Sequence, residues 1–572
     1  MPVQNAEIAA LFTRYADLLE VEDANPFRVR AYRNAARVVG GDSRSMADLL
    51  SAGRDLTELP GIGKDLAAKI AVVVATGRLP QLEELQRRIP GALSDLMQLP
   101  GLGPKRVKLL YRELKIRNHE DLLRAARSGK LAELPGFGPK LMQKITEALL
   151  HAVTGPKRTR LADAEQVVMP ILAHLKKLSG VTSVEVAGSF RRRQETVGDL
   201  DILAVADRPV AVIRRFVAYP GVAEVLSQGD TRSSIRLRSG MQVDLRVVPQ
   251  ESHGAALYYL TGSKAHNIAV RKLAQARKLK INEYGIYRGE KRIAGRSEAE
   301  LFETMGLAYI PPELRENRGE IAAASRGRLP ALITAADLRG DLHSHTRETD
   351  GRDSLQDMAD AARARGYEYL AVTDHTRRVS VAHGMDERRL RAQMAAIDRL
   401  NAGFTGFRLL KSAEVDILED GSLDLPDSVL RELDVVVGAV HYGLDMPRTR
   451  QTRRLLKALD NPRLHILAHP TGRLIDSRRP MDYDFERILR AAKETCCCLE
   501  VDSQPERLDL DDVHCKLAKE MGVRLVISSD AHSAGGLALI RFGVDQARRG
   551  WLEARDVLNT QSLDGLLAGL KR

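Results

Sequence analysis

Three parts of the chain differ in how hydrophobic and polar positions alternate. Residues 1–160 follow the three-to-four-residue spacing of short amphipathic helices. Residues 181–205 and 241–248 alternate as half-buried strands do. From residue 338 onward, apolar runs separated by helical stretches predict seven strands, around 338–342, 369–373, 407–413, 434–440, 464–468, 497–501 and 523–528. The pattern predicts a multidomain protein with a helical N-terminal part, an α+β middle and a C-terminal α/β barrel.

The N-terminal part contains one motif three times. Leu59–Gly63, Leu99–Gly103 and Leu134–Gly138 each have the order leucine, proline, glycine, hydrophobic residue, glycine, and a lysine-containing helical stretch follows each copy. One copy could be a plain helix end with a turn. Three copies favour helix-hairpin-helix units, in which glycines present backbone N–H groups to a phosphate without reading the DNA sequence. The candidate contacts are Gly61, Gly63, Gly101, Gly103, Lys105, Arg106, Gly136 and Gly138.

Charge is distributed unevenly along the 572 residues. The net charge is +8 over residues 1–160, +5 over 161–316 and −1 over 317–572. A basic first half suits a polyanionic partner such as DNA, although an arginine-rich proteome would also produce it. Residues 27–39 (FRVRAYRNAARVV) predict a basic amphipathic helix, which is either a second phosphate-binding surface or a solvated charged face.

The middle of the chain carries a group of carboxylates on predicted strands. Asp199 and Asp201 are two residues apart and therefore point to the same face of one strand. Asp244 lies in a second apolar strand. Such a group is best explained by divalent metal ions, since unpaired carboxylates repel one another. Gly188-Ser189, with Arg192 close by, could hold a phosphate.

These residues resemble the palm of the family X DNA polymerases. The sequence YLTGS followed by His266-Asn267, Arg271 and Asn282-Glu283-Tyr284 resembles that family's thumb. The resemblance implies metal binding by Asp199, Asp201 and Asp244, and nucleotide binding by Gly188, Ser189, Arg192, Tyr259, Gly262, Lys264 and Asn267. It also implies DNA contacts by Arg271, Glu283 and Tyr284, and 5′-phosphate contacts by Arg28 and Tyr32.

Three positions depart from the family pattern. Leu260 replaces a second aromatic residue, so discrimination between sugars could be looser. Lys264 stands where the animal repair enzymes have an acid and could raise nucleotide affinity. Lys69 occupies the place of the Schiff-base lysine of a deoxyribose-phosphate lyase site, but Asp65 stands where a phosphate-binding lysine is expected. Lys69 is therefore either a nucleophile or a hairpin contact to phosphate.

Histidines and carboxylates lie at the ends of nearly every predicted C-terminal strand, as in barrel-like α/β enzymes. Six histidines and three acids form the set His343, His345, Asp350, His375, Glu414, His441, His469, Asp530 and His532. His383, His465 and His514 lie outside strand ends and are expected to be structural or exposed. Imidazole and carboxylate together suit Zn²⁺ or Mn²⁺ better than Mg²⁺ alone.

This half resembles the polymerase-and-histidinol-phosphatase (PHP) domain, a distorted seven-stranded barrel with up to three metal ions. The resemblance implies one ion at His343, His345, Glu414 and Asp530. It implies a second at Glu414, His441 and His469, and a third at Asp350, His375 and His532. The expected role is activation of water and charge neutralisation on a phosphoester.

The whole chain resembles the bacterial family X DNA polymerases with a C-terminal PHP nuclease. We expect helix-hairpin-helix domains over 1–88 and 89–160, the palm over 161–250, the thumb over 251–316, a linker over 317–337 and the PHP domain over 338–572. The expected function is gap filling in DNA repair with Mg²⁺ or Mn²⁺, combined with a 3′–5′ exonuclease, abasic-site endonuclease or 3′-phosphoesterase that uses Mn²⁺ or Zn²⁺. The alternatives are a small-molecule phosphoesterase tethered to DNA and a non-catalytic DNA-end scaffold.

The remaining expectations concern compartment and partners. No apolar run reaches the roughly 18 residues of a membrane span, and the N-terminus lacks the order of a signal peptide. Four cysteines, three of them adjacent, form neither a disulfide framework nor a zinc knuckle. We therefore expect a cytoplasmic, nucleoid-associated monomer whose partners are gapped or nicked DNA and deoxynucleoside triphosphates.

Overall fold

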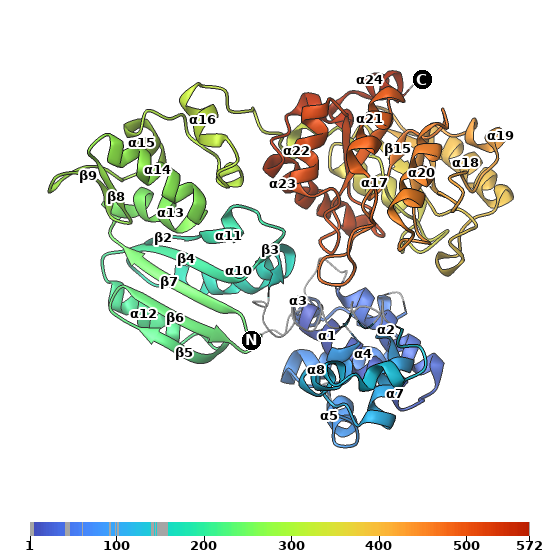
Figure 1. Cartoon of the computed structure of the whole chain (residues 1–572), viewed down its shortest axis with the longest axis horizontal. Helices are drawn as coiled ribbons and strands as arrows, with labels where there is room; N and C mark the ends of the chain where they lie inside the picture. Colours follow the sequence, from blue (N-terminus) through green and yellow to red (C-terminus); the bar gives the residue numbers. More distant parts are fainter. Residues whose placement is uncertain are drawn as a thin grey trace. The chain divides into compact units, whose positions relative to one another are not determined.

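The computed structural model describes residues 5–40, 46–59, 61–90, 93–97, 99, 102–138, 142, 145 and 158–570 (Figure 1). The chain forms two compact units, Met1–Arg158 with Asp476–Arg478, and Thr159–Ile475 with Arg479–Arg572. Among the helices of the described residues, none has both the length and the apolar character that a membrane crossing requires.

The first unit is helical, as predicted. Its described helices are α1 (Asn5–Val21), α2 (Pro26–Gly40), α3 (Met46–Ser51), α4 (Lys64–Thr76), α5 (Pro80–Gln86), α6 (Leu93–Leu96), α7 (Pro104–Leu114) and α8 (His119–Arg127). Helices α4 and α7 begin directly after Gly63 and Gly103, whose extended backbones are the N-caps. Apolar side chains such as Phe12, Ile70 and Leu102 are buried in one core. The hairpin glycines therefore lie at helix starts, where backbone N–H groups have no partner within the helix.

The palm is a five-stranded sheet in the order β2-β4-β7-β6-β5 (Figure 1). Its strands are β2 (Val181–Val186), β4 (Asp199–Ala206), β5 (Val222–Gln228), β6 (Arg232–Leu237) and β7 (Gln242–Val248). Helices α10 (Leu161–Lys176) and α12 (Pro209–Val217) share a buried core with the sheet. A separate apolar cluster joins β4 and β7 to α13 (His253–Thr261). The short helix α11 (Gly188–Arg191) and the pair β1 (Thr159–Arg160) and β3 (Thr196–Val197) complete this part.

The thumb has its own apolar core. It consists of α14 (Lys264–Ala276), β8 (Lys280–Asn282), β9 (Gly285–Arg288), β10 (Lys291–Ala294), α15 (Glu298–Thr304) and the 3-10 turn η4 (Pro312–Leu314). The segment 317–337, expected to be a linker, contains helix α16 (Glu320–Ser325). Glu320 is completely buried and pairs with His266 of α14 at 2.7 Å. The segment is thus packed into the thumb through a buried hydrogen bond between distant residues.

The C-terminal half is a seven-stranded parallel sheet whose strands follow one another in chain order. The strands are β11 (Gly340–Asp341), β12 (Tyr369–Val372), β13 (Arg408–Asp416), β14 (Val435–Ala439), β15 (Ile466–Leu467), β16 (Cys498–Asp502) and β17 (Leu525–Ser528). The amide of Asn559 joins the first strand to the last by donating to the carbonyls of Gly340 and Ile527, each at 2.8 Å. The sheet is a nearly closed barrel, and the predicted fold class is confirmed.

Helices connect and flank the barrel strands. They are α17 (Leu355–Ala364), α18 (Glu387–Asn401), α19 (Asp427–Leu430), α20 (Arg448–Leu459), α21 (Phe485–Glu494), α22 (Asp512–Met521), α23 (Ile540–Arg549) and α24 (Leu563–Leu570). Phe542 of α23 belongs to the same buried cluster as the palm core. The barrel and the palm are consequently parts of one packed unit.

Candidate active sites of the palm and the barrel

Three palm carboxylates lie on neighbouring strands. Asp199 and Asp201 lie two residues apart on β4. In the parallel pairing of β4 with β7, Asp201 is directly opposite Asp244. Burial, together with the negative charges of Asp199 and Asp244, raises the pKa of Asp201 to about 7. A buried acid whose pKa is raised by neighbouring carboxylates is stabilised in its charged form by a cation, and oxygen ligands suit Mg²⁺ or Mn²⁺. The donor set therefore fits a divalent metal site.

The backbone that follows β2 approaches this acidic group closely. Gly188 has a left-handed conformation (φ +60°), and a Cβ atom at this position would collide with the carboxylate of Asp201. Ser189 is the next residue, in the single turn of α11. Glycine is required here both by the conformation and by the contact. The Gly188-Ser189 pair is thus next to the metal-binding acids.

Arg192 connects this loop to the thumb. Its side chain, 13% exposed, donates from Nε to Glu316 at 2.9 Å and from Nη1 to the carbonyl of Thr261 at 2.5 Å. Gly262 has φ +69°, and a Cβ atom there would lie 3.2 Å from Nη1 of Arg192. A guanidinium beside the Gly188-Ser189 loop is suited to a triphosphate, which takes several charge-assisted hydrogen bonds.

Other predicted nucleotide and DNA contacts lie on the thumb. The guanidinium of Arg271 stacks on the ring of Tyr259 at 5.0 Å, and Asn267 donates to the carbonyl of Tyr259 at 2.8 Å. Lys264 is the first residue of α14. Two further DNA contacts were predicted on the thumb. Tyr284 is 41% exposed, and Glu283 pairs with Arg246 at 3.6 Å.

In the first unit, Lys69 forms an ion pair with Asp65 and lies 5.5 Å from the ring centre of Tyr32. Burial acts to lower the pKa of Lys69, but hydrogen bonds with Asp65 and Tyr32 outweigh it and raise the pKa. A Schiff-base nucleophile must be a neutral amine. The pairing with Asp65 therefore favours Lys69 as a cationic contact to phosphate.

The other N-terminal candidates are divided between core and surface. Tyr32 is only 3% exposed and packs against Tyr15, whose hydroxyl accepts a hydrogen bond from Arg28 at 2.5 Å. Lys105 and Arg106 are exposed in the first turn of α7. Gly61 and Gly136 have left-handed backbones (φ +73° and +86°), whereas Gly63 and Gly138 do not. Gly101 lies outside the described residues.

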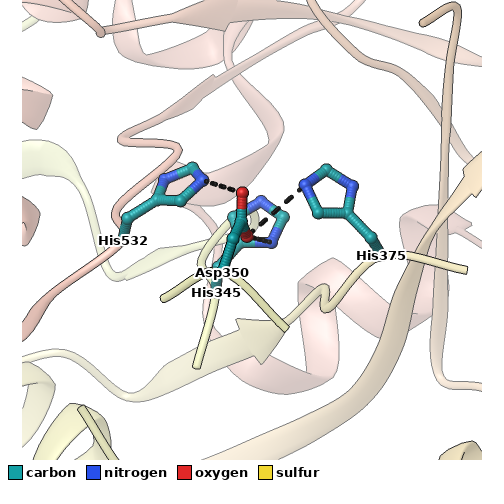
Figure 2. A group of neighbouring side chains, drawn as sticks. All are labelled: His345, Asp350, His375 and His532. Atoms are coloured by element: carbon teal, nitrogen blue, oxygen red, sulfur yellow. Dashed lines mark ion pairs between the residues drawn. The ribbon is translucent and has the colours of Figure 1, made fainter. Parts of the chain in front are cut away.

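The barrel brings its nine predicted ligands together. Figure 2 shows one group, in which three histidines surround Asp350. The distance from a carboxylate oxygen of Asp350 to a ring nitrogen is 3.6 Å for His375, 3.4 Å for His532 and 3.9 Å for His345. Three groups in the described chain have candidate ligand atoms within 4.8 Å of one another, and all lie in the barrel. They are His345, Asp350, His375 and His532; His343, His345 and Asp530; and His375, Glu414 and His441.

Glu414 occupies the centre of these groups. Its carboxylate lies 2.7 Å from His375, 2.9 Å from His469 and 3.3 Å from His441. His375 therefore belongs to two groups, one with Asp350 and one with Glu414. The resemblance implied only the group with Asp350. Burial acts to lower the pKa of His375, but Glu414 and Asp350 raise it to about 10.

The barrel site fits metal ions because several of its buried ligand atoms have no hydrogen-bond partner. Nε2 of His343, both ring nitrogens of His345 and Oδ1 of Asp530 are buried without a hydrogen bond. Polar atoms buried in this state cost free energy unless something coordinates them. Nitrogen and oxygen donors in this mixture suit Mn²⁺, Zn²⁺ or Fe²⁺.

Two positioning acids were not singled out from the sequence. Nδ1 of His343 donates to Glu500 on β16 at 2.8 Å, and Nδ1 of His441 donates to Asp416 on β13 at 3.0 Å. Each carboxylate fixes which ring nitrogen faces the centre. Asp416 belongs to the strand-end sequence SAEVD, and Glu500 belongs to LEVD. The sequence signal that could have identified them is a further acid near the candidate ligands of the barrel.

The chain is similar to known proteins over almost its whole length. A helix-hairpin-helix domain model matches residues 3–79, a tandem helix-hairpin-helix model matches 93–149 and a DNA polymerase beta thumb model matches 256–316. The DNA polymerase/3′–5′ exonuclease PolX of Bacillus subtilis is 39% identical over 571 residues, which covers 99% of both chains. The chain belongs to the bacterial family X DNA polymerases. The resemblance inferred from its motifs is thus confirmed.

The barrel alone is similar to another group of proteins. A probable phosphatase of Syntrophotalea carbinolica is 27% identical over 232 residues, 38% of this chain and 90% of that protein. A probable phosphatase of Acetivibrio thermocellus is 30% identical over 202 residues, 34% of this chain and 78% of that protein. The C-terminal part of this family X polymerase is therefore related to phosphoesterases that consist of little else.

Proposed function

We propose that the chain fills short gaps during DNA repair and shortens DNA from its 3′ end, using separate sites for the two reactions. One observation carries the proposal: a palm acid group with an adjacent Gly-Ser loop and a barrel with nine converging ligands occur in one chain. The PolX protein of Bacillus subtilis, which matches this chain over 99% of both lengths, is named a DNA polymerase/3′–5′ exonuclease.

At the palm, the primer 3′-hydroxyl attacks the α-phosphate of the nucleotide in line with the leaving pyrophosphate. Mg²⁺ or Mn²⁺, when bound, neutralises the phosphates and lowers the pKa of the hydroxyl. Asp199 and Asp201 would hold both ions, and Asp244 lies where it can assist the primer end. Arg192 exchanges its contact with the Thr261 carbonyl for the triphosphate, while Ser189 binds from the loop. Tyr259 borders the sugar, and Asn267 reaches the base.

At the barrel, the nine ligands would hold up to three Mn²⁺ or Zn²⁺ ions, which supply an activated water and neutralise the phosphoester. His343 and His441 are held in position by Glu500 and Asp416. A second candidate reaction, removal of a 3′-phosphate or cleavage at an abasic site, is favoured by the probable phosphatases that match the barrel.

One assay tests the proposal and separates its rivals. Purified protein is incubated with a 5′-labelled gapped duplex and Mn²⁺, with and without nucleotides. We expect extension with nucleotides and stepwise shortening without them. A second duplex ending in a 3′-phosphate tests the phosphatase reaction. Neither extension nor shortening would indicate a DNA-end scaffold, and hydrolysis of small phosphoesters alone would indicate a tethered phosphoesterase.

A further inference from the structure

The segment that follows Ser189 is held by side chains of the barrel. Asp545 of α23 pairs with Arg193 at 2.8 Å, and Arg549 of α23 donates to the carbonyl of Arg192 at 2.7 Å. A third barrel residue, Arg473, pairs with Glu195 at 2.6 Å. Residues 192–195 are thus attached to the barrel at three points within four residues.

These attachments act on a strained piece of backbone. Arg193 is not glycine, yet its φ is +56°, in the left-handed region. That conformation is unfavourable for a residue with a side chain and persists where surrounding contacts determine it. Asp545, 13% exposed, supplies such a contact through the Arg193 guanidinium. The local conformation next to Arg192 therefore depends on a barrel carboxylate.

A single carboxylate oxygen accepts hydrogen bonds from three side chains of this region. Oε1 of Glu316 accepts from Arg192 at 2.9 Å, from Gln194 at 2.6 Å and from Arg549 at 3.2 Å. Burial acts to raise the pKa of Glu316, but Arg192 and Arg549 outweigh it and lower the pKa. Arg549 is buried and also pairs with Asp512 of α22 at 2.6 Å.

The shared carboxylate has a direct consequence for nucleotide binding. Glu316 competes with a triphosphate for the charge of Arg192. Arg549 satisfies part of the Glu316 charge, so Glu316 holds Arg192 less tightly, and the guanidinium can exchange its contact with the Thr261 carbonyl for a phosphate. Without Arg549, Glu316 would hold Arg192 more strongly, and the Arg192 carbonyl would lose its donor.

We infer that helix α23 of the barrel positions the triphosphate-binding loop of the palm, with Arg549 and Asp545 as its positioning residues. The inference rests on the proposed role of Arg192 as a ligand of the triphosphate. It implies that nucleotide affinity at the polymerase site depends on two barrel residues that touch no barrel metal ligand in the contacts described above.

The test is steady-state gap filling by full-length Arg549→Met, with the KM for nucleotide separated from kcat. Methionine keeps an unbranched side chain and removes the charge. We expect the KM for nucleotide to rise about 5- to 20-fold, while 3′–5′ shortening stays within about twofold of wild type. Arg549→Lys, which retains the charge, should recover part of the affinity.

The chain offers a matched control on the same helix. Arg541 of α23 also pairs with a palm carboxylate, Glu165, at 2.6 Å, but that residue lies on α10 and is not part of the segment 188–195. Arg541→Gln should leave the KM for nucleotide unchanged. An equal rise in the KM for nucleotide in Arg541→Gln and Arg549→Met would overturn the inference. A general loosening of the contact between palm and barrel would then explain the rise in both variants.

A second variant covers the case in which Arg549→Met does not fold. Asp545→Asn is nearly isosteric and should still raise the KM for nucleotide about threefold or more. An unchanged KM in folded Arg549→Met, or in Asp545→Asn where the first variant does not fold, would refute the inference. Arg192→Ala identifies which idea fails: an unchanged KM there would refute the proposed triphosphate site itself.

Discussion

Gly188 brings the backbone of the proposed triphosphate loop against the carboxylate of Asp201, a candidate metal ligand. We expect Gly188→Ala to lower gap-filling activity by at least about 100-fold, since displacement of reacting groups by about 1 Å has effects of this size. The cause is the collision of the new Cβ with Asp201, in addition to backbone strain at φ +60°. Single-nucleotide insertion at saturating nucleotide measures it, and 3′–5′ shortening should be unaffected.

Gly180→Ala is the matched control for this substitution. Gly180 also has a left-handed backbone (φ +86°), but a Cβ atom there would have no neighbour within 4 Å. It should cost only about 1–2 kcal/mol of stability and leave insertion intact. Similar losses of insertion in both variants would mean that strain, and not the contact with Asp201, is responsible.

Glu500 illustrates a residue that acts through a metal ligand. It accepts from Nδ1 of His343 at 2.8 Å and from the backbone N–H of His469 at 2.7 Å. Glu500→Gln should weaken Mn²⁺ binding at the barrel about 10- to 100-fold, since such partners orient the ligand and raise its basicity. Calorimetric titration of the metal-free protein with Mn²⁺ measures the change. Glu368→Gln, which affects an ion pair with Arg339 and a hydrogen bond from the backbone N–H of Leu563, should not alter Mn²⁺ affinity.

At the scale of elements, α11, α15 and the turn η4 are joined by a buried ion-pair group. Glu298 accepts from Arg191 at 2.7 Å and from Arg315 at 2.6 Å, and Arg315 is completely buried. Burial acts to raise the pKa of Glu298, but the two arginines lower it to about 2. Glu298→Gln leaves Arg315 without a full counter-charge and should cost about 3–5 kcal/mol.

The sign of the pH dependence follows from the lowered pKa. A carboxylate with a depressed folded-state pKa contributes stability above its ordinary pKa of 4.5, and this contribution is lost as the pH falls toward about 2. The difference in melting temperature between wild type and Glu298→Gln should therefore be constant above about pH 5.5 and shrink between pH 4.5 and 3. A difference independent of pH over this range would contradict the assignment of the charge to Glu298.

The second hairpin provides a prediction about DNA binding. Lys105 and Arg106 are exposed in the first turn of α7, directly after the N-cap Gly103. Replacing both by Ala should flatten the slope of log affinity against log salt by about one to two units. Arg124→Ala, on α8 and paired with Asp121, is the control with an unchanged slope. An unchanged slope in the double variant would show that this hairpin does not touch DNA.

The seven barrel strands were predictable because each is a short apolar run with a polar end, a pattern that depends only on neighbouring residues. The candidate metal ligands could be proposed from the sequence for the same reason. The packing of 317–337 was not, because its small residues and arginines do not reveal that Glu320 is buried against His266, 54 residues earlier. The positioning role of Glu500 likewise depends on His343, which is 157 residues away in the chain.

At the scale of the whole molecule, the two chemistries occupy different sheets of the same unit. The palm acids lie on β4 and β7, and the barrel ligands lie at strand ends from β11 to β17. The described contacts between the barrel and residues 192–195 are made by α23 and by Arg473, and none of these contacts involves a candidate barrel ligand. Loss of a barrel metal ligand should therefore leave the polymerase site assembled.

This separation gives a reciprocal prediction. His345→Ala removes two buried ring nitrogens from the centre, and Asp530→Ala removes a carboxylate from the same group. Either should stop Mn²⁺-dependent shortening and reduce nucleotide addition by no more than a few-fold. Asp199→Ala should remove extension by at least about 10³-fold, because the lost ligand stabilises the transition state, while DNA binding and shortening persist.

Labelled gapped duplex with and without nucleotides measures all three variants in one experiment. The decisive comparison is shortening in His345→Ala against shortening in Asp199→Ala. If shortening survives in the former and disappears in the latter, hydrolysis belongs to the palm as a reversal of synthesis. The barrel would then act on small phosphoesters or only support the fold. Loss in His345→Ala alone places the nuclease in the barrel, since the two ligand sets share no residue.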